Sequence, residues 1–175
     1  MRWIFHIAWF ALLAGIAGTA PLLPAEVGDP GKTMPRPGFV LLMLTQAAFV
    51  PWLVTRGTAR IARHHPRYLN LPHKDYWFAE PRREASLAWL ERHCLGLGLA
   101  LVGLLAAAYY PAVRPALQPA LPGWPSLPAV PLVLPFLLYM GYWVWAAYRR
   151  FPKPPPEAGA PPTRATPRRP PAPRR

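Results

Sequence analysis

Four long apolar runs, separated by blocks of Lys and Arg, constrain the fold of this chain more than any other feature. The runs cover residues 3–23, 38–55, 94–113 and 128–148, and none of them contains Asp, Glu, Lys or Arg. A hydrocarbon core about 30 Å thick is crossed by roughly 20 helical residues, because each residue advances the helix by about 1.5 Å. The runs therefore predict four transmembrane helices at about these positions.

Buried helices of a soluble protein are the alternative, but the runs lack amphipathic patterning and too few polar residues remain to cover them. We therefore expect an all-α integral membrane protein, with a four-helix transmembrane domain over residues 1–150. A chain of 175 residues leaves no room for a second folded domain. Its one cysteine, Cys94, excludes an internal disulfide.

The distribution of positive charge predicts the orientation of the spans. Of the 20 Lys and Arg residues, 17 lie in the N-terminal stub, the second loop (56–93) and the C-terminal segment 149–175. Four spans place these three segments on one side, which the positive-inside rule assigns to the cytoplasm. We expect both termini to be cytoplasmic in a bacterial inner membrane. A cleaved signal peptide is the alternative for residues 3–23, although Pro21 after the plausible cleavage residue Ala20 disfavours it.

Small residues on the first and third runs predict where helices approach one another. They recur at intervals of three or four residues, so they share a helix face that permits close backbone approach in lipid. These residues are Ala11, Ala14, Gly15 and Gly18 on the first run, and Gly96, Ala100, Gly103 and Ala107 on the third. The fourth run ends in aromatic residues that are typical of the headgroup region, with a ligand-binding aromatic cage as the alternative.

The second loop is the most distinctive polar segment. Arg56, Arg60 and Arg63 have helical spacing, so we expect a basic helical extension of the second span that stops at Pro66. Residues 68–78 are expected to be extended or turn-like, because a proline at position 72 disfavours helix at the residue before it. Pro81 suits the first turn of a helix, which predicts a short interfacial helix leading into the third span.

This loop also contains a candidate interaction motif. We expect its aromatic residues to anchor the loop in the headgroups, while Lys74 and Asp75 pair or cap the backbone. An acid–base group of Lys74, Asp75 and Tyr76 is the chemical alternative, but no nucleophile or substrate pocket accompanies it in the sequence. The motif comprises Tyr68, Asn70, Pro72, Lys74, Asp75, Tyr76, Trp77, Arg82 and Arg83.

The histidines do not form a recognisable metal motif. His64, His65, His73 and His93 match no familiar zinc spacing, and no cysteine pair accompanies them. A bis-histidine haem site between His6 and His93, both near the expected cytoplasmic face, is the alternative. We predict interfacial histidines, with no catalytic residue, metal or cofactor.

Residues 68–84 resemble a motif, LN-P-KDYW-x-x-P-x-RR, of a family of small bacterial membrane proteins of unknown function. That family is similar to the N-terminal module of Sdp-type toxin-immunity membrane proteins. The first loop adds to the resemblance through LPAEV at 23–27, GDPGK at 28–32 and MPR at 34–36. The resemblance covers roughly residues 23–84 and implies a multi-span inner-membrane protein with no established enzymatic activity. Immunity function is not carried over to this chain.

The C-terminal segment 149–175 holds ten prolines and eight basic residues. Such a composition cannot bury a core, so we expect residues 151–175 to form a disordered Pro/Arg-rich cytoplasmic tail. We expect Arg149, Arg150 and Lys153 to face anionic headgroups, where each contributes about 1 kcal/mol of attraction. Docking onto an aromatic groove of a partner or onto nucleic acid is the alternative.

These expectations indicate a non-catalytic inner-membrane protein that acts as an accessory, regulatory or assembly subunit. Its expected partners are anionic lipid and either another membrane protein or a second copy of the chain. The net charge of +13 is better explained by lipid than by nucleic acid, because most of the charge lies beside apolar spans. The alternatives are a small transporter or channel-like oligomer, which would normally need ionisable residues inside the spans, and a haem-bearing electron-transfer subunit.

Overall fold

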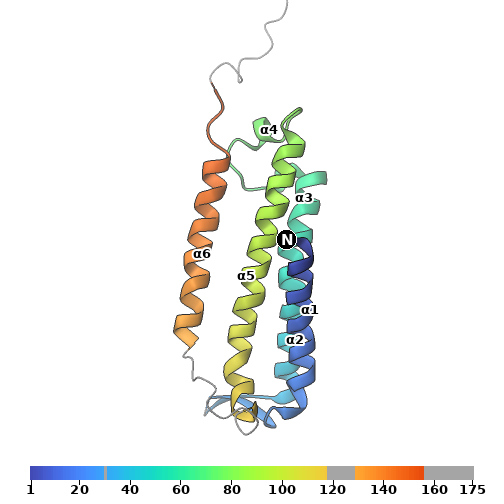
Figure 1. The fold of residues 1–175 in the computed structure, drawn as a ribbon, viewed down its shortest axis with the longest axis vertical. Helices are drawn as coiled ribbons and strands as arrows, with labels where there is room; N and C mark the ends of the chain where they lie inside the picture. The colour runs from blue at the N-terminus through green and yellow to red at the C-terminus, as the bar shows by residue number, and fades with distance from the viewer. Residues whose placement is uncertain (30, 118–128, 156–175) are drawn as a thin grey trace, which may run out of the picture.

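A computed structural model describes residues 1–29, 31–117 and 129–155 of the chain, which form a bundle of long helices (Figure 1). The long helices are α1 (Arg2–Thr19), α2 (Arg36–Trp52), α5 (Arg83–Leu117) and α6 (Ala129–Arg150). The shorter elements are a 3-10 turn (Ala20–Leu22), β1 (Glu26–Asp29), β2 (Lys32–Pro35), a π turn (Leu53–Gly57), α3 (Thr58–His64), a 3-10 turn (Pro66–Tyr68) and α4 (Lys74–Trp77).

Helix α5 occupies the middle of the bundle. In Figure 1, α1 and α2 lie on one side of α5 and α6 lies on the other. The β1–β2 hairpin is at one end, whereas α3, α4 and the end of α6 share the opposite end. The N-terminus lies part-way along α5, so α3 and the first turns of α5 project beyond it. The second loop and the C-terminal end of the last helix are thus at the same end of the bundle.

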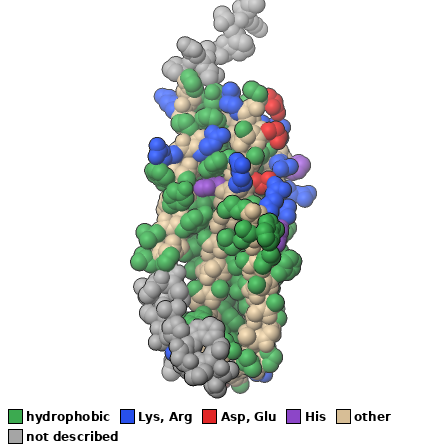
Figure 2. Space-filling view, viewed as in Figure 1, with side chains coloured by type: hydrophobic (Ala, Val, Ile, Leu, Met, Phe, Trp, Pro, Cys, Tyr) green, Lys and Arg blue, Asp and Glu red, His purple; other side chains and the backbone are tan. Residues whose placement is uncertain are grey.

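Among the described residues, three helical stretches are long and apolar enough to cross a membrane: Arg2–Leu22, Arg36–His64 and Arg83–Pro115. Large apolar side chains such as Phe10, Leu41 and Phe49 are exposed, and Figure 2 shows basic side chains gathered toward the end with α3 and α4. The helical, apolar class predicted from the sequence is confirmed. Helix α6 covers the fourth predicted span from Ala129 and continues two residues beyond its predicted end at 148. Residues 118–128 and 156–175 lie outside the described part of the chain.

The second span and its basic extension form a continuous helical stretch, as predicted. Helix α2 passes through the π turn into α3, which ends at His64, two residues before Pro66. The hydroxyl of Thr55 in the π turn donates to the carbonyl oxygen of Pro51 in α2 at 2.8 Å, so this backbone acceptor at the end of α2 is satisfied.

The third span and the predicted interfacial helix are one uninterrupted helix, α5, rather than two elements. It begins at Arg83 and continues to Leu117, beyond the predicted end at 113. Residues 68–78 are turn-like, one of the two predicted forms, and they contain the single helical turn α4. His73 precedes that turn with a left-handed φ of 51°.

The hairpin was not predicted. Its strands are antiparallel, and Asp29 pairs with Lys32 across the turn. Gly28 and Gly31 have φ values of 134° and 82°, which glycine adopts readily. The guanidinium of Arg36 donates to the carbonyl oxygens of Pro21 and Leu23, which ties the start of α2 to the segment between α1 and the hairpin.

A buried apolar cluster holds the hairpin end of the bundle together. It joins Leu23 and Val27 beside the hairpin to Met43 of α2 and Val113 of α5. Tyr109 belongs to the same cluster, and its hydroxyl lies 2.8 Å from the hydroxyl of Thr19, across the α1–α5 contact.

The predicted small-residue faces account for only part of the helix packing. Of the four glycines on these faces, three would have nothing within 4 Å of an added Cβ: Gly15, Gly18 and Gly103. A Cβ on Gly96 would meet the hydroxyl of Tyr139, as the third-run face predicts. Gly98 lies off that face, yet an added Cβ there would meet the side chains of Thr55 and Phe5.

Candidate functional site

The second loop folds over one end of the bundle as an ordered cap, here residues 66–86. The ammonium group of Lys74 donates to the carbonyl oxygens of Arg67 and Leu69, which holds the first half of the cap. In the second half, Nε of Arg82 donates to the carbonyl oxygen of Tyr76 at 3.1 Å. The same guanidinium lies over the Tyr76 ring, 3.8 Å from its centroid. These three motif residues therefore shape the loop itself.

Phe151 joins the cap to the end of α6. Its side chain is 1% exposed, and the rings of Trp77, Phe78 and Trp89 lie around it at centroid distances of 6.0, 6.2 and 5.4 Å. The indole Nε1 of Trp77 donates to the carbonyl oxygen of Pro152 at 3.0 Å. Trp77 and Phe78 thus pack within the protein, where headgroup contacts were expected. Phe151, predicted to begin the tail, belongs to the folded bundle.

The remaining motif residues divide between the surface and the helix ends. Arg83 donates through Nη2 to the carbonyl oxygen of Arg63 at 2.8 Å, which fastens the start of α5 to the end of α3. The others are exposed or half-buried on the outside of the cap: Tyr68, Asn70, Pro72 and Asp75. Tyr68 is 66% exposed, and its side chain is the largest available to a partner on this part of the cap.

His93 is held between two indole rings. Its ring centroid lies 4.2 Å from that of Trp89 and 4.7 Å from that of Trp143, with near-parallel planes. Its Nε2 donates to the carbonyl oxygen of Trp143 at 3.0 Å, and the indole of Trp143 donates to the carbonyl oxygen of His93 at 3.1 Å. His6 lies elsewhere, with Nε2 3.3 Å from the guanidinium of Arg56. The structure therefore gives each imidazole a separate protein partner and does not present the two as a free ligand pair.

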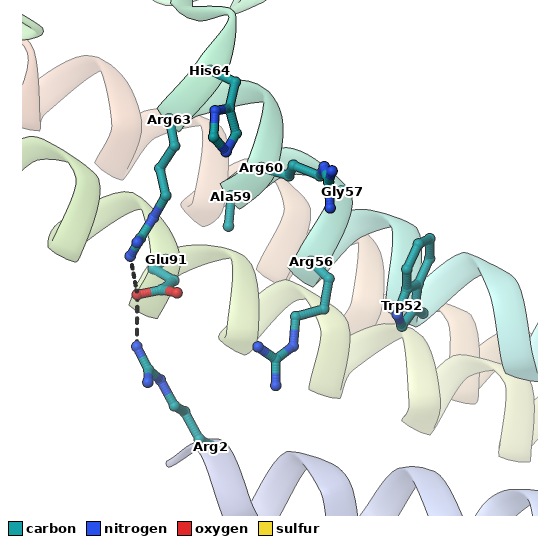
Figure 3. A pocket seen from close by; sticks show the side chains of 9 residues that line it. All are labelled: Arg2, Trp52, Arg56, Gly57, Ala59, Arg60, Arg63, His64 and Glu91. Carbon is teal, nitrogen blue, oxygen red and sulfur yellow. Dashed lines mark hydrogen bonds and ion pairs between the residues drawn. The ribbon is translucent and has the colours of Figure 1, made fainter.

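A second feature at this end is a basic groove of about 450 Å³ between α1, α5 and the α2–α3 stretch. Figure 3 shows the groove, in which Arg2 and Arg63 both point toward Glu91. The shorter ion pair joins Arg2 to Glu91 at 2.7 Å, and the longer joins Arg63 to the same carboxylate oxygen at 3.7 Å. The groove is lined by Arg2, Trp52, Arg56, Gly57, Ala59, Arg60, Arg63, His64 and Glu91.

The basic residues predicted to face lipid lie where α6 meets the cap. Arg149 is exposed, with its guanidinium 4.9 Å from the Trp145 ring centroid. Arg150 is half-buried and lies 5.5 Å from the Trp77 ring centroid. Lys153 is exposed. Arg149 and Arg150 thus combine charge with aromatic contacts, an arrangement suited to a membrane surface.

Sequence reasoning found only one wall of the groove. It placed Arg56, Arg60 and Arg63 on a basic helix, and the structure confirms that placement. It did not bring Arg2 and Glu91 to them, because these residues come from helices that are distant in the sequence.

Within residues 1–29, 31–117 and 129–155, no group of three His, Cys, Asp or Glu side chains is arranged to hold a metal ion. No protein-family model matches the chain, and neither a curated protein nor a solved structure matches it significantly.

Proposed function

We propose that this chain is a non-catalytic inner-membrane protein with four spans and cytoplasmic termini, which acts as an accessory, regulatory or assembly subunit of a membrane complex. The observation that carries the proposal is that exposed apolar and exposed polar side chains occupy different parts of its surface. Exposed apolar side chains follow the bundle, whereas an ordered cap with exposed polar residues closes one end (Figure 2). Such a bundle would face lipid along its sides and present the cap to a partner.

Two features support four spans. Helix α6 has 22 residues, which is enough for a crossing of about 30 Å, and it packs along α5. The second loop, which carries one large basic block, and the end of α6, where the other block begins with Arg149 and Arg150, lie at the same end of the bundle (Figure 1). The positive-inside rule would place that end in the cytoplasm.

Reporter fusions test the topology. A fluorescent protein fused after Arg175 is expected to fold and fluoresce, because that terminus is proposed to be cytoplasmic. Alkaline phosphatase fused after Gln118, in the third loop, is expected to be active outside the cytoplasm. An active external reporter after Arg175 would contradict the proposed orientation.

Affinity purification in mild detergent tests the partner role of the cap. A membrane protein, or a second copy of the chain, that co-purifies with the wild type is expected to be lost from the double variant Y68A/D75N. The matched control is Y148A, because Tyr148 is 64% exposed and Tyr68 is 66% exposed, but Tyr148 lies on α6. Retention of the partner by Y68A/D75N, or equal loss from the control, would contradict a partner-binding cap.

A further inference from the structure

The basic groove contains more positive charge than its internal ion pairs use. Four arginines line it with a single carboxylate, that of Glu91. Arg2 and Arg63 share this carboxylate, so one negative charge serves two guanidinium groups. The groove is therefore a site of net positive charge even before its other arginines are considered.

Arg56 and Arg60 form the part of the groove that is open to an anion. In the described part of the chain, neither forms an ion pair with a carboxylate. Arg56 instead lies 3.3 Å from Nε2 of His6, and Arg60 is exposed. In Figure 3, the Arg56 side chain extends toward the same space as Arg2. Guanidinium groups bind phosphate oxygens through parallel N–H donors, so this wall suits a phosphate group.

The position of the groove favours a lipid over a soluble anion. Trp52 lines it and is 47% exposed, at the end of the apolar part of α2. Exposed tryptophan at such a boundary is typical of the headgroup level of a bilayer. The next residue toward α3, Leu53, is 58% exposed and offers apolar surface beside the groove. A ligand with a phosphate next to an acyl chain would meet both kinds of surface.

We infer that this groove binds the phosphate headgroup of an anionic phospholipid, with Arg56 and Arg60 as the phosphate-binding residues. The Arg2–Glu91–Arg63 ion pairs form the fixed wall behind them and join α1, α3 and α5. A volume of about 450 Å³ is ample for a glycerophosphate headgroup. The inference rests on the proposed membrane placement and adds a specific ligand to it.

The test is the melting temperature of the purified full-length protein in neutral detergent, titrated with phosphatidylglycerol or phosphatidylcholine. Phosphatidylglycerol is expected to raise the melting temperature saturably, and phosphatidylcholine much less. R60Q, which alters an exposed side chain, is expected to weaken the apparent affinity for phosphatidylglycerol about fivefold, and R56Q/R60Q about 30-fold. Melting in phosphatidylcholine alone shows whether each variant is folded.

A matched control distinguishes a site from diffuse attraction. R67Q/R92Q removes the same charge from two exposed arginines at the same end that do not line the groove, and it is expected to keep the saturable response. Equal losses in both double variants, or no preference for phosphatidylglycerol, would overturn the site. Inorganic phosphate is the last ligand to be tested. If it alone raises the melting temperature in the same arginine-dependent way, the ligand is a soluble anion and the lipid assignment is overturned.

Carbonate extraction separates this inference from the proposed function. A protein that carbonate releases from membranes is not integral, and the proposed function then fails together with the lipid site. A protein that stays in the membrane fraction but responds equally to both lipids loses only the headgroup site.

Discussion

The indole Nε1 of Trp9 donates a hydrogen bond to the carbonyl oxygen of Ala47 at 2.6 Å. In an uninterrupted helix this carbonyl would accept from the N–H of residue 51, but that residue is Pro51, which has none. Trp9 of α1 thus supplies the donor that the proline removes from α2. A backbone carbonyl without a partner is costly in lipid, so the bond both accommodates the proline and fixes α1 against α2.

The first prediction is that W9F lowers the free energy of unfolding by about 1–3 kcal/mol, because the Ala47 carbonyl loses its donor. Unfolding in mixed detergent, followed by circular dichroism, measures the change. P51A restores the backbone N–H, so the cost of W9F is expected to be smaller in a P51A background. W3F is the control, because Trp3 is 68% exposed. Equal costs of W9F in the two backgrounds would contradict the assigned role.

The second prediction concerns Gly98, where α5 approaches Phe5 and Thr55. G98L is expected to destabilise the bundle by about 1–3 kcal/mol, since the added side chain has no space between the helices. G103L is the matched control on the same helix, because a Cβ at Gly103 would have nothing within 4 Å. Thermal unfolding in detergent compares the two, and a G98L protein as stable as G103L would show that the helices do not meet here.

The third prediction concerns the attachment of the cap to α6. F151A removes a ring that is 1% exposed, and it is expected to cost about 3–5 kcal/mol and to loosen the cap. Trypsin is then expected to cut faster at Arg67 and Arg82. F49A is the control, because Phe49 is 65% exposed on the apolar side of α2. Wild-type resistance of F151A to trypsin would show that the cap is held by other contacts.

The fourth prediction separates the two interactions of His93. H93F keeps a ring between Trp89 and Trp143 but loses the donor to the Trp143 carbonyl, so a loss of about 0.5–1.5 kcal/mol is expected. H93A loses the stacking as well, so its free energy of unfolding is expected to be about 1 kcal/mol lower than that of H93F. Thermal unfolding gives the order of the three proteins. Equal melting of H93A and the wild type would exclude a stabilising role for the stack.

The features that could be predicted from the sequence are those that depend on neighbouring residues. The absence of charge over 94–113 was sufficient to place α5 through this stretch, and the spacing of Arg56, Arg60 and Arg63 with the stop before Pro66 predicted α3. These signals are local, because helix formation and partition into lipid depend on residues within one segment.

The features that could not be predicted depend on contacts between distant segments. The hairpin requires Gly28 and Gly31 to adopt positive φ. The apolar pattern that predicts the helices contains no sign of this requirement. Trp77 and Phe78 looked like headgroup anchors because their packing partner, Phe151, lies over 70 residues away. Arg2 and Glu91 are 89 residues apart, and nothing in either neighbourhood indicates their pairing.

Helix α5 contributes to both ends of the bundle. Val113 packs in the cluster beside the hairpin, and Leu90 packs in the cluster that contains Phe151. At about 1.5 Å per residue, its 35 residues span about 50 Å, well beyond a hydrocarbon core of about 30 Å. It is a single helix that reaches from one end of the bundle to the other, with Pro111 and Pro115 in its last turns. A change in its tilt, such as one imposed by bilayer thickness, would displace the hairpin and the cap together and in opposite directions.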